Sequence, residues 1–231
     1  MKKLFTILFS ILYFIIFLSF SKSLAAEAIL IPIHVHILES DEEGFKTKTT
    51  LDSVKKDLDR ANTIWSESNI VWNIKEISFI KYKPINHLIR VKKIKNDCLS
   101  THACTGKASK SKRDKLRKFY NETVRYSETN KKNTFNVYYI PSSIVNVCGI
   151  TFMPKSVKKN YVIIGQKKNP TPGFRCSTSR TLAHELGHLL SLKHVGGTEN
   201  LMSTGGVNGK ELNNTQKNKA YNFYKSKINF K

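Results

Sequence analysis

Residues 181–188 read Thr-Leu-Ala-His-Glu-Leu-Gly-His, and this stretch decides the fold. Leu182, Leu186 and Leu189 recur at the spacing of one apolar helical face. His184 and His188 are four residues apart, so on a helix their side chains project from one face, one turn apart. We therefore predict a helix over residues 179–192 that packs on a core and presents two imidazoles elsewhere.

Two imidazoles at this spacing are typical of a helix that binds one zinc ion. Glu185 follows the first histidine, so it flanks the metal and is placed to take a proton from a zinc-activated water. A catalytic zinc needs a third protein ligand and one open position. His194 follows six residues after His188, and it reaches the metal only if the helix ends near Leu192 and the chain turns back.

The pattern His184-Glu185-x-x-His188-x-x-x-x-x-His194, followed by Leu201-Met202-Ser203, resembles the metzincin zinc peptidases. The resemblance implies that the three histidines bind one Zn²⁺ ion and that Glu185 is the general base. It also implies that Met202 lies in a turn that forms a hydrophobic floor under the ligands. The specific motif covers residues 184–202, and it does not assign a subfamily.

The resemblance implies an α/β (α+β) fold, in which a twisted mixed sheet packs with an active-site helix, a second long helix and a C-terminal helix. Ser191 departs from the family pattern, which usually has glycine three residues after the second histidine. A side chain at positive φ costs roughly 1 kcal/mol. We therefore expect this turn either to be shaped differently or to carry strain.

The remaining elements are predicted from hydrophobic periodicity. The first strand is expected at 28–38, near a sheet edge or irregular at Pro32, and a helix at 51–65 with Thr50 as N-cap. His34 and His36 share one face of that strand. We interpret them as strand residues, with a second metal site as the alternative. Other strands are expected at 70–80, 136–140, 148–153 and 161–165, and helices at 111–127 and 215–227.

The N-terminus has the pattern of a signal peptide. Two lysines precede a mainly apolar run at 4–20 that contains no charged residue, and small residues follow around Ala25. We predict cleavage after Ala25, which leaves 26–231 as a single catalytic domain that is secreted, periplasmic or extracellular. An uncleaved segment would instead anchor the protein in a membrane. Because the first strand starts almost at the cleavage site, no pro-domain is expected.

Four cysteines follow the predicted signal: Cys98, Cys104, Cys148 and Cys176. An even number in an exported chain favours two disulfides, for which three pairings exist. We favour Cys98–Cys104 and Cys148–Cys176. A second metal site at Cys98, Cys104 and His102 is the alternative, but it lacks a fourth ligand.

The chain is strongly basic, with a net charge of +22, and the excess is densest from Lys81 to Lys118. This segment predicts either an anionic partner, such as an acidic glycan or surface, or a solvated surface without a partner. The lysines form no specific nucleic-acid motif. We expect a monomer.

The predicted function is hydrolysis of a protein or peptide substrate by a secreted zinc endopeptidase. By resemblance, an extended substrate binds the edge strand before the active-site helix, for which the candidate residues are Gly149, Ile150, Thr151 and Phe152. One alternative is a zinc hydrolase of another class, with Glu211 as third ligand or a non-peptide amide as substrate. Another is a basic surface-binding protein with a structural zinc.

Overall fold

The computed structural model describes residues 27–39, 49–81, 134–141, 148–152, 161–166, 178–203 and 209–228. Its elements are β1 (Ile29–Glu39), α2 (Leu51–Trp65), the short 3₁₀ helix η1 (Ser66–Ser68), β2 (Ile70–Lys81), β3 (Phe135–Pro141), β4 (Gly149–Phe152), β5 (Tyr161–Gln166), α5 (Thr178–Leu189) and α6 (Asn214–Ile228). The helix predicted at 111–127 lies outside the described residues.

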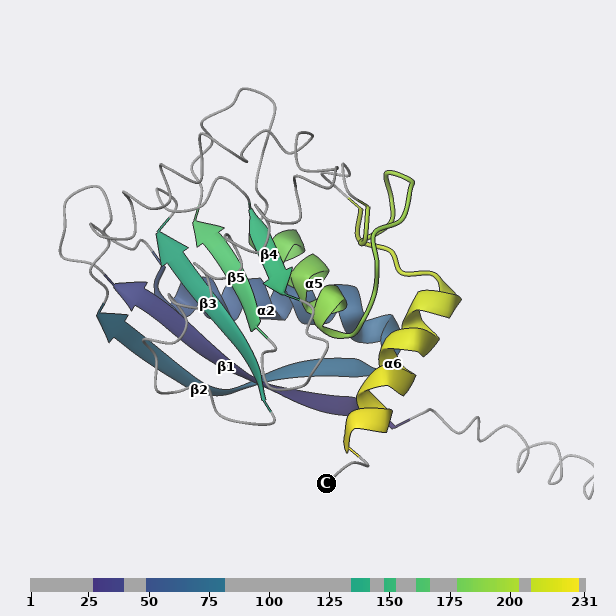
Figure 1. The fold of residues 1–231 in the computed structure, drawn as a ribbon, viewed down its shortest axis with the longest axis horizontal. Helices are drawn as coiled ribbons and strands as arrows, with labels where there is room; N and C mark the ends of the chain where they lie inside the picture. The colour runs from purple at the N-terminus through teal and green to yellow at the C-terminus, as the bar shows by residue number, and fades with distance from the viewer. Residues whose placement is uncertain are drawn as a thin grey trace, which may run out of the picture.

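The five strands form one sheet in the order β2-β1-β3-β5-β4 (Figure 1). The pairs β1–β2, β1–β3 and β3–β5 are parallel, whereas β4 runs antiparallel to β5. A mixed sheet with helices α2, α5 and α6 confirms the predicted fold class. The antiparallel strand β4 ends the sheet on the side of α5, so it is an edge strand, as expected.

Helices α2 and α5 lie against each other and share one hydrophobic core with the sheet (Figure 1). Alternate residues of β1, including Ile33 and Val35, face this core. The indole N–H of Trp65 donates to the carbonyl of Ala183 at 3.2 Å, which ties the end of α2 to the middle of α5. The core thus holds α5 in place from its buried side.

Helix α2 begins at the predicted cap. The Thr50 hydroxyl accepts from the Ser53 backbone N–H at 3.2 Å, and the Ser53 hydroxyl accepts from the Thr50 N–H at 2.9 Å. This reciprocal pair is a capping box, which satisfies two backbone donors at the start of the helix.

Pro32 does not place β1 at an edge, so that expectation is wrong: β1 lies between β2 and β3. Among the described residues, the pairing with β3 starts only at Ile33, so Pro32 pairs there with β2 alone. Its missing N–H is therefore tolerated inside the sheet. The alternative expectation of an irregularity is confirmed, because the register shifts between Ile33 and His34.

The predicted signal peptide at 1–25 lies outside the described residues, so both its cleavage and the single-domain boundary stay predictions. In the part of the chain that the structure describes, no helix has the length and apolar character needed to cross a membrane.

Candidate metal centre

Helix α5 ends in a turn that sends the chain back toward its own histidines. The Gly187 carbonyl accepts from the Leu192 N–H at 3.0 Å, and the His188 carbonyl accepts from the Ser191 N–H at 2.9 Å. These two bonds form a Schellman motif, which requires one residue in the left-handed conformation. Ser191 is that residue, with a φ of 66°. Helix α5 therefore ends at Leu189, before the predicted end near Leu192. Of the two expectations for this turn, the strained conformation is the one observed, because Ser191 has a positive φ.

The turn brings three imidazole nitrogens together. The Nε2 atom of His194 lies 3.2 Å from Nε2 of His184 and 3.0 Å from Nε2 of His188. All three ligand atoms lie within 4.8 Å of one another. Tetrahedral zinc with Zn–N bonds of about 2.0–2.1 Å separates its ligand nitrogens by about 3.3 Å. The two short separations fit this donor set.

Backbone carbonyls decide which nitrogen of each helical histidine faces the metal position. Nδ1 of His184 donates to the Leu201 carbonyl at 2.6 Å, and Nδ1 of His188 donates to the Leu192 carbonyl at 2.7 Å. A carbonyl can only accept, so each Nδ1 carries the proton and each Nε2 keeps its lone pair. Such outer hydrogen bonds orient metal-binding imidazoles.

Burial keeps the three imidazoles neutral. It lowers the pKa of His184 to about 4, although the hydrogen bond to Leu201 acts in the opposite direction. Burial also lowers the pKa of His188 and of His194. Neutral imidazole is the form that binds a metal ion, so the site does not have to lose protons at neutral pH.

Met202 lies directly under α5. It is fully buried, and a Cβ atom placed on Gly187 would lie 2.6 Å from its Sδ. The Met202 N–H donates to the Asn200 side chain at 2.9 Å, and the Asn200 amide pairs with Gln216 of α6. The turn that contains Met202, called the Met202 turn, thus lies between α5 and α6. The resemblance implies a hydrophobic floor at this position.

Arg180 forms hydrogen bonds to the segment around Met202. It lies on α5, four residues before His184. Its guanidinium donates to the carbonyls of Gly209 at 2.8 Å, Leu201 at 3.2 Å and Ser203 at 3.3 Å. The Leu201 carbonyl therefore accepts from both Arg180 and His184. Sequence reasoning missed this residue. Its position four residues before His184, on the same helical face, was the available signal.

Glu185 is buried against the edge strand. A Cβ on Gly149 would lie 2.6 Å from its Cγ, and the Thr151 hydroxyl lies 2.5 Å from its Oε2. Burial raises the pKa of Glu185 to about 7, whereas the Thr151 hydrogen bond and the charge of Arg180 act in the opposite direction. A bound dication would act in the same direction as Arg180. Three neutral imidazoles with a buried carboxylate beside them are typical of a mononuclear metal-dependent hydrolase.

The alternative ligand Glu211 does not join this group. Among the described residues, the cluster with metal-ligand spacing consists of His184, His188 and His194. Glu211 is exposed and precedes α6 instead of lying on it. Its backbone pairs with the Met202 turn, because its carbonyl accepts from the Leu201 N–H at 2.8 Å.

Cys148 is disulfide-bonded, but Cys98, Cys104 and Cys176 lie outside the described residues. The pairing Cys148–Cys176 therefore stays a prediction.

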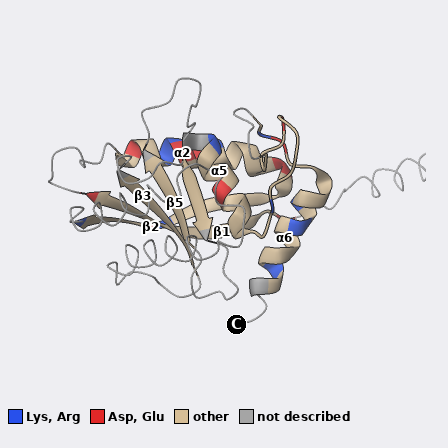
Figure 2. Cartoon of the chain, turned by 45° about the horizontal axis from the view of Figure 1, so that its top comes forward, with Lys and Arg blue, Asp and Glu red and all other residues tan. Residues whose placement is uncertain are grey.

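The segment Lys81–Lys118 is described only at Lys81. Figure 2 shows basic residues on both α2 and α6.

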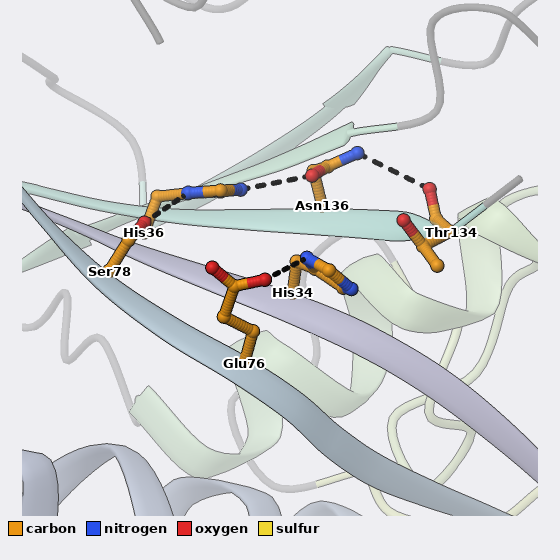
Figure 3. Close-up of polar contacts among 6 residues, drawn as sticks. All are labelled: His34, His36, Glu76, Ser78, Thr134 and Asn136. Atoms are coloured by element: carbon orange, nitrogen blue, oxygen red, sulfur yellow. Dashed lines mark hydrogen bonds and ion pairs between the residues drawn. The ribbon is translucent and has the colours of Figure 1, made fainter. Parts of the chain in front are cut away.

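His34 and His36 make polar contacts on the side of β1 that faces away from the hydrophobic core (Figure 3). His36 binds Ser78 through Nδ1 at 2.6 Å and Asn136 through Nε2 at 2.9 Å. Nδ1 of His34 lies 3.5 Å from the Glu76 carboxylate. In the described part of the chain these residues form no metal-ligand cluster. The structure thus agrees with their interpretation as strand residues.

A family model supplies the identity. The model described as metallo-peptidase family M12B, reprolysin-like, matches residues 51–195, which is more than half of the chain and includes all three histidines. The chain therefore belongs to the reprolysin-like metallopeptidases of family M12B. The predicted resemblance to metal-dependent peptidases is confirmed, and the family match gives the subfamily that the motif did not assign.

Solved structures with a similar chain course were also found. Archaemetzincin from Methanopyrus kandleri has 14% identity and a TM-score of 0.48, with 84% of this chain and 96% of that chain covered. Metalloproteinase-II from Bacteroides fragilis has 12% identity and a TM-score of 0.47, with 86% and 55% covered. A chaperone–substrate complex has 15% identity and a TM-score of 0.41, with 78% and 28% covered.

This chain therefore spans only part of the last two of these proteins. All three similarities are too weak to support a conclusion about activity. No curated protein matches the sequence.

Proposed function

We propose that this metallopeptidase is a zinc endopeptidase in which Glu185 is the general base. The convergence of three imidazole Nε2 atoms, two of them oriented by backbone carbonyls, is the observation that carries the proposal. Bound Zn²⁺ supplies Lewis-acid polarisation and a lowered water pKa at such a site. Among the described residues the cluster holds three ligands, which leaves a coordination position open and favours a catalytic over a structural ion.

Glu185 has the properties of a base that works near neutral pH. Burial raises its pKa to about 7 without a metal, and a bound dication would lower it, so the carboxylate would be ionised and able to accept a proton near neutral pH. Its position directly after the ligand His184 supports a place beside the metal. It would take the proton of the attacking water and pass it to the leaving amine.

An extended peptide is proposed to add to the edge of β4 that pairs with no strand in the described part of the chain. The Gly165 N–H donates to the Cys148 carbonyl at 3.0 Å, and Ile150 pairs with Ile163 two residues further along. Bonded and non-bonded pairs alternate in an antiparallel ladder, so Gly149 and Thr151 direct their backbone N–H and C=O groups away from β5. These groups would bind the substrate backbone.

Matched Glu→Gln variants test the proposed chemistry. Wild-type protein, Glu185→Gln and the exposed control Glu211→Gln would be compared for zinc content and for cleavage of a mixed peptide library. We expect all three to hold one zinc, and only Glu185→Gln to lose cleavage, by a factor of about 10² or more. Zinc-loaded wild type that cuts no peptide would instead favour a structural zinc or a non-peptide amide substrate. Loss of zinc from Glu211→Gln would return Glu211 to the ligand set.

An N-methyl scan of a cleaved peptide tests strand addition. Each N-methyl group removes one backbone donor of the substrate. We expect sensitivity at alternate residues, because only every second residue of an added strand faces β4. Equal sensitivity at successive residues would contradict this binding mode.

We further propose that the protein acts after export, with residues 1–25 as the signal and with Cys148 paired to Cys176. The basic segment Lys81–Lys118 is proposed to attract an anionic glycan or surface, and the protein to act as a monomer. N-terminal sequencing of the secreted protein and non-reducing peptide mapping test the first two points. Salt-dependent retention on heparin and light scattering test the others.

A further inference from the structure

The edge strand β4 touches the carboxylate of Glu185 as well as ending the sheet. Gly149 and Thr151 are two residues apart, so they share the face of β4 that meets α5. The Glu185 side chain packs so closely on Gly149 that a Cβ there would lie 2.6 Å from Cγ and 2.9 Å from Oε1. Only a residue without a side chain leaves room for the carboxylate at this point.

Thr151 binds the other carboxylate oxygen. Its hydroxyl lies 2.5 Å from Oε2 of Glu185 and 2.9 Å from the Glu185 backbone carbonyl. A hydroxyl has one hydrogen to donate. We assign this hydrogen to the shorter contact, because a carboxylate oxygen is a stronger acceptor than a backbone carbonyl oxygen.

The side chain of Thr151 is itself restricted. Threonine is β-branched, so few rotamers are open to it in a strand. A donor held in this way limits the rotation of the carboxylate that it binds, whereas Gly149 limits its translation.

We infer that Thr151 is a positioning residue that sets the orientation of the Glu185 carboxylate relative to the edge of β4. The inference rests on the proposed function. The same residue directs its backbone groups toward the proposed substrate and its side chain toward the proposed base. The strand that is proposed to align the peptide would thus also align the proposed base.

Three threonine variants of the zinc-loaded full chain test the inference. Thr151→Val keeps the shape but removes the hydroxyl, Thr151→Ser keeps the hydroxyl, and Thr63→Val removes an exposed threonine hydroxyl on α2 that bonds the Asp59 carbonyl at 3.0 Å. For a peptide cleaved by wild type, kcat, KM, zinc content and Tm would be measured.

We expect Thr151→Val to lower kcat by about 10- to 100-fold, because small misplacements of a catalytic group cost factors of this size. KM should change less than about threefold and zinc content not at all, since the variant leaves the substrate-facing backbone and the imidazoles in place. Thr151→Ser should restore kcat to within about fivefold of wild type, and Thr63→Val should equal wild type.

A wild-type kcat in Thr151→Val would overturn the inference while leaving the proposed function intact. So would an equal loss in Thr151→Ser, because the hydroxyl would then not be the cause. Zinc-loaded wild type that cleaves nothing would instead overturn the proposed function, and the positioning role with it. If Thr151→Val does not fold, Thr151→Ala takes its place, and the same comparison with Thr151→Ser decides.

Discussion

Gly187 and Met202 are packed so tightly that a Cβ on Gly187 would lie 2.6 Å from the Met202 sulfur and 3.4 Å from Trp65. The glycine between the two helical ligands is therefore the point where α5 rests on the floor of the site. A methyl group there has no free volume, because Met202 and Trp65 are both fully buried.

Replacing this glycine tests the contact. We expect Gly187→Ala to lower the free energy of unfolding by about 1–3 kcal/mol through overpacking. Gly196→Ala is the matched control, because nothing lies within 4 Å of its added Cβ, and it should be neutral. Denaturant unfolding of the zinc-loaded proteins measures both. The double variant Gly187→Ala/Met202→Ala should lose less than the sum of the single changes, and strict additivity would contradict the contact.

The strained helix end predicts a stabilising substitution. Ser191 has a φ of 66°, which costs a side chain about 1–2 kcal/mol, whereas glycine adopts it freely but adds entropy to the unfolded chain. We expect Ser191→Gly to gain about 0.5 kcal/mol and Ser191→Val to lose more than 1 kcal/mol, since β-branched residues are worst in this region. Thermal unfolding measures both. A loss of stability in Ser191→Gly would show that the serine hydroxyl is needed.

Arg180 predicts an effect on metal affinity without touching the metal position. We expect Arg180→Lys to weaken zinc binding by about 10-fold or more, because one ammonium group cannot bind three carbonyls in the planar arrangement of a guanidinium. Arg60→Lys, on the exposed face of α2, should not change the affinity. Competition with a chromophoric chelator measures the zinc affinity. Equal affinities for the two variants would contradict a role of Arg180 in orienting His184 through the Leu201 carbonyl.

The buried network around His36 predicts a pH dependence of stability. Burial, the largest cause, lowers the pKa of His36 below its ordinary 6.5, although the Asn136 hydrogen bond acts in the opposite direction. The unfolded chain therefore binds the proton more readily than the folded protein. The contribution of neutral His36 to the free energy of unfolding is complete above pH 6.5. It is lost as the pH falls from there toward the pKa of His36 in the folded protein, at up to about 1.4 kcal/mol per pH unit.

The variant His36→Gln isolates this contribution. It keeps an amide donor toward Asn136 and removes the titration. We expect the free energy of unfolding of His36→Gln to fall less steeply than that of wild type between pH 6.5 and 5. Because the metal ligands titrate in both proteins, only the difference in slope counts, and parallel curves would refute the assignment.

Most of the ligand set was predictable from the sequence, because it is local. His184 and His188 lie on one continuous helix, whose 3.6-residue period by itself places their side chains together. The spacing of His194 predicted a turn, but only the structure shows that Ser191 adopts the left-handed conformation that makes this turn. The cost of that conformation is met by the Schellman hydrogen bonds and the packing around them.

Contacts between distant segments were decided by the tertiary structure alone. Thr151 and Glu185 are 34 residues apart, and Arg180 reaches carbonyls 21 to 29 residues away. Sheet order brings the first pair together, and the return of the chain under α5 brings the second. Pro32 is a further example. Its missing N–H was evident from the sequence, whereas the start of the β3 pairing at Ile33 was not. Periodicity determines which face a residue occupies, whereas the partner on that face depends on how the whole chain packs.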